Sequence, residues 1–194
     1  MIHDPTHTRL GELSDALTIS RGIPTQETAS SGQLPVYSVP ELRTGVDPKR
    51  FTNQASLRHG KWSTAAEDDV LIAIEGAAAG EVFVVPKDFP RFVASQQVAV
   101  ISVQDRSRLD PWYLGAFLSL TSSRNQMRSL ARGQKVQRIP LHDLNTVMIS
   151  LPPLTQQASY GHHYRVYQRA IRAHREMAQH LEKMCSSNTE INLT

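Results

Sequence analysis

The chain has 194 residues, enough for one domain with its own core and an appendage but few for two complete domains. Its hydrophobic content of 40% and charged content of 20% exclude an intrinsically disordered chain. The formal net charge of +3, from 21 Lys and Arg against 18 Asp and Glu, is too small to indicate a polyanionic partner by itself.

The cysteine count and the first residues exclude further classes of protein. The single cysteine, Cys185, excludes an internal disulfide and a zinc site built from several cysteines, and it suits a reducing cytoplasm. The first ten residues are polar and include Asp4, so they predict no secretory signal. No apolar run is long enough for a transmembrane helix.

The first third of the chain predicts short strands between polar loops. Residues 10–19 alternate loosely and predict a turn followed by a strand. Residues 21–33 are rich in Gly, Pro, Ser and Thr and predict a loop. Residues 35–39 predict a short strand, and residues 44–62 are polar and irregular.

The middle of the chain carries the strongest strand signals. Residues 70–74 and 82–85 are apolar runs separated by the small-residue turn 76–80, which predicts a hairpin. Asp68 and Asp69 precede the first run as a strand-initiating turn. Residues 98–103 predict a further strand.

Helical spacing appears after these strands. Pro111 is suited to the first position of a helix, and apolar residues at helical spacing predict that this helix runs to about Leu130. Residues 147–151 predict a last strand. The order predicts an α+β chain: a β-rich body with short helices, then one long C-terminal helix.

The C-terminal helix is the clearest periodic segment. Pro152 and Pro153 block helix continuation, so a helix begins after them with Thr155 as a suitable N-cap. We expect it to span 155–185, about 46 Å at about 1.5 Å per residue, with 186–194 as a tail. Apolar or aromatic residues spaced four and three apart predict a coiled-coil seam: Tyr160, Tyr164, Tyr167, Ile171, His174, Ala178, Leu181 and Cys185. The seam either pairs with another molecule or folds back on its own domain, because such a helix is not stable alone.

The ordered set of these segments resembles a target recognition domain of a type I restriction–modification specificity subunit. The elements that carry the resemblance are an acidic pair before a strand, a glycine turn, a glutamine-centred strand, an Asp-Pro helix start, a glycine-to-isoleucine loop and a double proline that opens a long helix. Here they are Asp68 and Asp69, Gly76 to Gly80, Gln96 and Gln97, Asp110 to Leu114, Gly133 to Ile139, and Leu151 to Gln157.

The resemblance implies a target recognition domain over 1–151 that binds double-stranded DNA sequence-specifically and performs no catalysis itself. It implies a DNA methylation subunit as partner, with an endonuclease subunit as a further one. The chain would bind no cofactor, and S-adenosylmethionine would bind only the methylation subunit. Family members usually carry two recognition domains and two helices. This chain has one of each, so the resemblance implies a half-subunit whose two-fold homodimer rebuilds the pair.

Loop residues that can neutralise phosphates or read base edges are the candidate DNA contacts. Between Arg43 and Lys61 five Lys and Arg residues meet one acid, Asp47, so this loop is the strongest candidate. The alternative for each residue is an ordinary solvated side chain. The candidates are Arg21, Gln26, Arg43, Lys49, Arg50, Asn53, Arg58, His59, Lys61, Gln134, Lys135 and Arg138.

The sequence gives little support for a catalytic function. The adjacent His162 and His163 point in different directions on a helix and make a poor metal clamp. The turn at Gly76 to Gly80 lacks the lysine of a phosphate loop. Two other functions stay open: a decoy module that occupies a methylation subunit but binds DNA poorly, and the recognition part of a methyltransferase split between two polypeptides.

Overall fold

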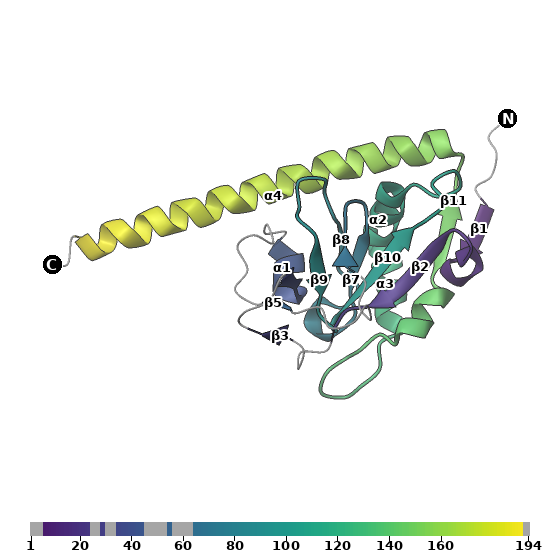
Figure 1. The fold of residues 1–194 in the computed structure, drawn as a ribbon, viewed down its shortest axis with the longest axis horizontal. Helices are drawn as coiled ribbons and strands as arrows, with labels where there is room; N and C mark the ends of the chain where they lie inside the picture. Colours follow the sequence, from purple (N-terminus) through teal and green to yellow (C-terminus); the bar gives the residue numbers. More distant parts are fainter. Residues whose placement is uncertain (1–5, 24–27, 30–33, 45–53, 56–63, 192–194) are drawn as a thin grey trace.

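The structure, a computed structural model, describes residues 6–23, 28–29, 34–44, 54–55 and 64–191. Figure 1 shows a body of strands and short helices beneath one long helix, which extends beyond that body toward the C-terminus. The predicted α+β fold with a long C-terminal helix is confirmed. In the described part of the chain, no helix has the length and apolar character to cross a membrane.

The strands are short, and several pair with strands distant in sequence. They are β1 (Thr6–Arg9), β2 (Leu17–Arg21), β3 (Thr28–Ala29), β4 (Leu34–Tyr37), β5 (Gln54–Ala55), β6 (Thr64–Ala65), β7 (Val70–Ala73), β8 (Val82–Val84), β9 (Phe92–Ala94), β10 (Val98–Val103) and β11 (Met148–Leu151). The helices are α1 (Val39–Thr44), α2 (Pro111–Ser119), α3 (Thr121–Ser129) and α4 (Leu154–Ile191), with 3-10 helices η1 (Leu10–Leu13), η4 (Gly76–Ala78) and η5 (Leu141–Thr146).

A four-stranded antiparallel sheet, in the order β2-β10-β7-β8, forms the centre of the body. Along β7, Val70 and Ile72 pack into one core cluster with helix α2, while Leu71 and Ala73 pack into a second cluster. Both faces of the strand are therefore buried, which explains why its sequence is a continuous apolar run.

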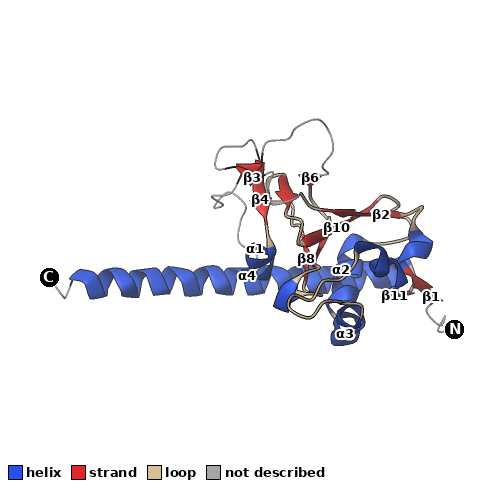
Figure 2. Cartoon of the chain, turned by 90° about the horizontal axis from the view of Figure 1, so that it is seen from below, coloured by secondary structure: helices blue, strands red, loops and turns tan. Residues whose placement is uncertain are grey.

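The second sheet is mixed and lies beside the first. Its order is β3-β5-β4-β9-β6, in which β4 and β9 run parallel and the other pairs run antiparallel. Aromatic rings fill the core between the sheets: the centroid of Tyr37 lies 5.8 Å from that of Phe83 and 4.8 Å from that of Phe92. Figure 2 shows these strands to one side of α4.

The predicted hairpin is confirmed. Strands β7 and β8 pair antiparallel, and 3-10 helix η4 forms the turn between them. Gly76 and Gly80 have φ values of 77° and 84°, a region that favours glycine. Asp68 and Asp69 form the predicted turn before β7, and Asp68 has a φ of 69°.

The prediction of one helix from Pro111 to about Leu130 is wrong. Helix α2 ends at Ser119, Leu120 is extended with a ψ of 146°, and α3 begins at Thr121. The hydroxyl of Ser119 donates to the carbonyl of Gly115 over 2.7 Å, a side-chain bond that competes with regular helix continuation. The interruption therefore lies where serine and threonine replace the apolar residues of α2.

Strand β11 pairs antiparallel with β1 and leads directly into α4. As predicted, the helix begins after Pro152 and Pro153, at Leu154 rather than after Thr155. It continues to Ile191, beyond the predicted end at Cys185, and contains 38 residues, about 57 Å at about 1.5 Å per residue.

Candidate nucleic-acid and partner interfaces

The first turns of α4 are attached to the start of α2 through Gln157, whose side chain is buried. Its Oε1 accepts the backbone N–H of Asp110 over 2.9 Å, and its Nε2 donates to the carbonyls of Pro152 over 2.8 Å and Arg108 over 3.2 Å. The carboxylate of Asp110 in turn caps α2 by accepting the N–H of Tyr113 over 2.7 Å. One amide thus joins the double-proline segment, the start of α2 and α4.

One turn further along, Gly161 lets the two helices approach closely. A Cβ at this position would lie 2.6 Å from Oδ1 of Asp110 and 2.9 Å from the backbone nitrogen of Tyr113. Both distances are shorter than real Cβ contacts, so any larger residue would push α4 away from α2.

Tyr164 continues this contact face into the body. Its hydroxyl lies 2.7 Å from that of Ser119, and its ring lies 6.4 Å from the ring of Trp112. Burial raises the pKa of the Tyr164 phenol, so the group remains neutral.

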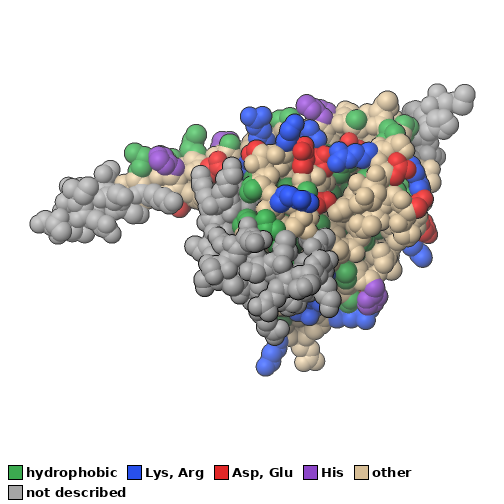
Figure 3. All heavy atoms as spheres, in the orientation of Figure 1, with side chains coloured by type: hydrophobic (Ala, Val, Ile, Leu, Met, Phe, Trp, Pro, Cys, Tyr) green, Lys and Arg blue, Asp and Glu red, His purple; other side chains and the backbone are tan. Residues whose placement is uncertain are grey.

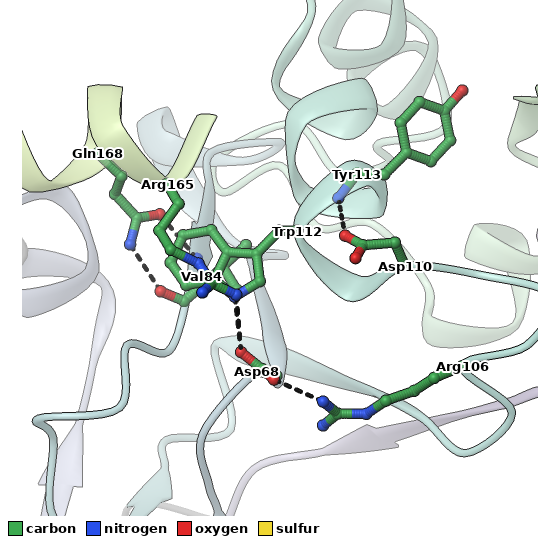
Figure 4. Close-up of polar contacts among 8 residues, drawn as sticks. All are labelled: Asp68, Val84, Arg106, Asp110, Trp112, Tyr113, Arg165 and Gln168. Atoms are coloured by element: carbon green, nitrogen blue, oxygen red, sulfur yellow. Dashed lines mark hydrogen bonds and ion pairs between the residues drawn. The ribbon is translucent and has the colours of Figure 1, made fainter. Parts of the chain in front are cut away.

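Trp112 and Asp68 form a second attachment point, shown in Figure 4. The indole Nε1 of Trp112 donates to Asp68 over 2.6 Å, and Arg106 donates to the same carboxylate over 2.8 Å. From α4, the guanidinium of Arg165 stacks 4.6 Å from the centre of the Trp112 ring and lies 3.9 Å from Asp68. Asp68 therefore has a structural role that links the turn before β7 to α2 and α4.

Gln168 attaches α4 to the edge of the central sheet. Its side-chain amide accepts the N–H of Val84 over 3.0 Å and donates to the carbonyl of Val84 over 2.6 Å, as Figure 4 shows. Val84 belongs to β8, the last strand of the sheet. The amide therefore takes the place of a neighbouring strand and satisfies an edge that would otherwise be unpaired.

The predicted seam residues lie on more than one side of α4. Tyr164 and Ile171 are partly buried toward the body, whereas the other six are exposed: Tyr160, Tyr167, His174, Ala178, Leu181 and Cys185. Figure 1 shows the C-terminal part of α4 extending beyond the body. In this projecting part Met177, Leu181 and Met184, spaced four and three apart, are 64%, 54% and 51% exposed.

The sequence interpretation missed two sets of residues on α4. It did not single out Met177 and Met184, although they share the helical spacing of Leu181. It also missed Gln157 and Gln168, because it searched for an apolar stripe and the face that meets the body is largely polar. A signal was present: Gln157, Gly161, Tyr164 and Gln168 repeat at intervals of four, three and four residues.

Five of the twelve proposed DNA contacts lie in the described part of the chain: Arg21, Arg43, Gln134, Lys135 and Arg138. The other seven lie outside the described residues, so loop 43–62 stays a prediction: Gln26, Lys49, Arg50, Asn53, Arg58, His59 and Lys61. On the face seen in Figure 3, the described Lys and Arg side chains occupy several separate places.

Gln134, Lys135 and Arg138 belong to one loop, residues 132–138. Backbone pairing between Arg132 and Arg138 closes its base, and Gly133 has a φ of 115°. The guanidinium of Arg138 binds Glu75 over 2.7 Å, while Gln134 and Lys135 are exposed. Figure 1 shows this loop on the side of the body away from α4.

The other two described candidates lie elsewhere. Arg21 is exposed and its Nε donates to the carbonyl of Gln96 over 2.9 Å. Arg43 lies beneath α4, where its Nε is 3.3 Å from Glu81 and its carbonyl accepts from Arg175. The structure therefore does not bring Arg43 together with Lys135.

The residues considered for catalysis occupy ordinary structural positions. Asp69 accepts the N–H of Ala66 over 2.8 Å, and burial raises the pKa of its carboxyl. His162 and His163 are exposed on α4. Among the described residues, no group of three or more His, Cys, Asp or Glu side chains is arranged to hold a metal ion.

Comparison with known proteins extends over nearly the whole chain. The model of the family described as "Type I restriction modification DNA specificity domain" matches residues 5–182, which include the body and most of α4. No curated protein matches the chain.

Three solved structures share the fold. The S subunit of a type I restriction–modification system from M. genitalium is similar with a TM-score of 0.58 and 18% identity, over 84% of this chain and 39% of that one. The HsdS subunit from Thermoanaerobacter tengcongensis is similar with a TM-score of 0.60 and 22% identity, over 92% of this chain and 41% of that one. A structure from work on complex assembly and conformational transition of the type I R-M system is similar with a TM-score of 0.63 and 20% identity, over 96% of this chain and 44% of that one. The chain therefore spans less than half the length of each.

Proposed function

Because the chain belongs to the family of type I restriction–modification DNA specificity domains, we propose that it is a DNA-binding specificity half-subunit. In this proposal the body reads one half of a DNA target, and two copies together read both halves. The single observation that carries it is the family match over residues 5–182, which extends through the body into α4.

The recognition surface is proposed to include the loop 132–138. Gln134 and Lys135 are exposed in this loop, while Arg138 and Glu75 hold its base. An amide and a cation on an exposed loop are suited to base-edge and phosphate contacts. Arg21 and the candidates outside the described residues complete the proposed surface.

The two copies are proposed to pair through the projecting part of α4. This part carries Met177, Leu181 and Met184, which are large apolar side chains with more than half of their surface exposed. A two-fold dimer makes one such stripe complementary to itself, and it separates two DNA-reading bodies by a defined distance.

The chemistry is proposed to belong to a partner. A DNA methylation subunit would bind S-adenosylmethionine and transfer the methyl group, while this chain supplies no catalytic group and binds no cofactor. An endonuclease subunit is a further proposed partner, and the complex would act in the cytoplasm.

The test is reconstitution with a DNA methylation subunit, followed by single-molecule sequencing of methylated bases in a host that carries both. We expect methylation at one two-part DNA sequence. Methylation without sequence preference, or a stable complex with the methylation subunit that does not bind DNA, would contradict the proposal and favour the decoy function.

A variant sharpens this test. Lys135→Ala should weaken DNA binding and lower the dependence of log affinity on log salt by about one, because each phosphate contact releases about one counterion. Arg91→Ala is the matched control, since Arg91 is exposed and is not a candidate contact. Equal effects of the two substitutions would remove Lys135 from the site.

A further inference from the structure

A cavity of about 610 Å³ lies between α4 and the body. The body lines it with α1, the start of β8, the end of α2 and the first half of α3, and α4 lines it from Tyr164 to Arg175. Its volume falls within the range of about 300–1,000 Å³ that is usual for small-molecule sites.

Positive charge is in excess around this cavity. Four arginines line it, Arg43, Arg124, Arg172 and Arg175, against the single carboxylate of Glu81. Arg172 is balanced by Asp88, which it binds over 2.8 Å. Three arginines therefore share the one carboxylate of the described lining, which leaves an excess of two positive charges among the described residues that line the cavity.

The individual contacts show how weakly these arginines are satisfied. Nε of Arg43 lies 3.3 Å from Glu81, whereas Nη2 of Arg124 is 3.8 Å from the same carboxylate. The Nε of Arg124 is buried, and it has no hydrogen-bond partner in the part of the chain that the structure describes. Arg175 donates to the backbone carbonyl of Arg43, a neutral acceptor. A buried donor without an acceptor is costly, so the described residues leave the guanidinium of Arg124 incompletely paired.

We propose that this cavity binds a phosphate group, in the form of a phosphate monoester or diphosphate. A phosphate monoester carries about −1.5 to −2 charge, which matches the excess of two positive charges, and a diphosphate carries more. Its oxygens accept the paired N–H bonds that guanidinium groups donate. The hydroxyl pair of Ser119 and Tyr164 lies on the same wall and offers a further polar contact.

A ligand in this cavity would contact both the body and α4. Arg43 and Arg124 belong to the body, whereas Arg175 belongs to α4. A phosphate bound between them joins the helix to the body beyond the contacts of Gln157 and Gln168. The ligand would therefore add to the contacts that already hold α4 at its angle to the body. The inference is separate from the proposed function, because the site requires neither DNA sequence recognition nor a dimer.

Titration calorimetry of the full chain with pyrophosphate tests the site directly. We expect saturable binding to one site per chain and a rise in melting temperature in the presence of pyrophosphate, because the ligand binds only the folded state. Absence of saturable binding would overturn the proposal.

Single charge removals locate the binding. Arg124→Gln and Arg175→Gln should each weaken pyrophosphate binding about tenfold or more, the usual loss for a charge-assisted hydrogen bond. Arg175 is exposed on α4, so its variant stays folded even if the change at Arg124 disturbs the body. Arg91→Gln removes one charge from an exposed position outside the cavity and should bind as the wild type does. Equal affinity in all four proteins, or equal weakening in all three variants, would overturn the proposal.

Competition with duplex DNA identifies the source of the phosphate. Displacement of pyrophosphate by a short duplex would show that the site takes the phosphodiesters of the DNA backbone, and it would overturn the assignment to a phosphate monoester or diphosphate. Pyrophosphate binding that a saturating duplex leaves unchanged would assign it to a free phosphorylated compound. A sequence-specific duplex that binds normally while pyrophosphate does not bind would contradict this site and leave the proposed function intact.

Discussion

The two parts of α4 differ in how their surfaces are used. The docked part, from Leu154 to Arg175, meets the body through Gln157, Gly161, Tyr164 and Gln168, which make specific polar or close contacts. The projecting part, which follows Arg175, carries Met177, Leu181 and Met184 as exposed apolar side chains. One continuous helix therefore combines a face already matched to its own domain with a stripe that has the composition of an interface.

The docked part therefore sets the direction of α4 relative to the body, whereas the projecting part is suited to association with another molecule. Hydrogen bonds and a glycine contact fix the angle between α4 and the body, because they tolerate little displacement. Apolar side chains on the projecting part attract a partner surface through the hydrophobic effect, which does not depend on direction. Changes in the docked part should therefore lower the stability of the chain, and changes in the projecting part should alter assembly without altering that stability.

The largest effect on stability is expected for Gly161→Leu. It should lower the free energy of unfolding by about 2–3 kcal/mol, because overpacking against Asp110 and Tyr113 outweighs the gain of about 1 kcal/mol in helix propensity. Chemical denaturation measures the change. Ala158→Leu, at an exposed position of the same helix, should leave stability equal or slightly lower, because Leu has a slightly lower helix propensity than Ala. A Gly161 variant as stable as this control would show that the close helix contact is unimportant.

A somewhat smaller loss is expected for Gln157→Leu. The substitution leaves the N–H of Asp110 and the carbonyls of Pro152 and Arg108 without their partner, at a cost of about 2 kcal/mol. Gln156 is adjacent in sequence but exposed, so Gln156→Leu is the matched control and should stay within about 0.5 kcal/mol of the wild type. Urea unfolding compares the two, and equal midpoints would contradict the assigned role of Gln157.

Removing the cation from the Trp112 ring should have a still smaller effect. Arg165→Gln should cost about 0.5–1 kcal/mol, the usual size of a cation–π contact at an exposed site. Arg169→Gln, one turn along and exposed, should have no measurable effect on the melting temperature. If both variants melt alike, the stack of Arg165 on Trp112 contributes nothing to holding α4.

The smallest effect on stability, combined with a change in mass, is expected for Leu181→Glu. At concentrations where the protein is monomeric, unfolding should stay within about 0.5 kcal/mol of the wild type, because this side chain is exposed. At higher concentrations light scattering should show that the dimer is lost, because a charge then lies in an apolar interface.

Gln179→Glu adds the same charge on the opposite side of the helix and should retain the wild-type mass. A Leu181 variant that also keeps the mass of the wild type would show that the proposed dimer does not use this stripe. Ile171→Glu is a less selective probe, because Ile171 also lines the cavity next to the body.

Much of the body could be predicted from local patterns. The run 98–103 coincides with β10, and the runs around β7 and β8 pair as the predicted hairpin, because each is apolar and bounded by glycine, proline or charged turns. The helix after Pro111 begins where predicted, since proline there needs no hydrogen-bond partner. Its interruption at Leu120 was not predicted, because no proline or glycine stands at residues 119–121 to indicate it, and the hydroxyl of Ser119 changes the local hydrogen bonding.

The candidate site was less accessible to sequence reasoning. Lys135 and Gln134 were recognised as exposed loop residues, and they are exposed. Arg43 was chosen for its charge, and the structure instead places it beside Glu81 beneath α4. Its partner comes from a distant turn, so charge alone could not distinguish a free cation from a paired one.

The sequence by itself determined that a long helix follows Pro152 and Pro153, because proline restricts the backbone locally whatever the rest of the chain does. It also determined that this helix has aromatic and apolar residues at regular spacing. Only the tertiary structure decided which side of the helix the body occupies. Tyr164 and Tyr167 are chemically identical, yet one is bonded to Ser119, 45 residues away, and the other is exposed. Gln168 finds Val84 across 84 residues, a distance over which only the folded chain brings two groups together.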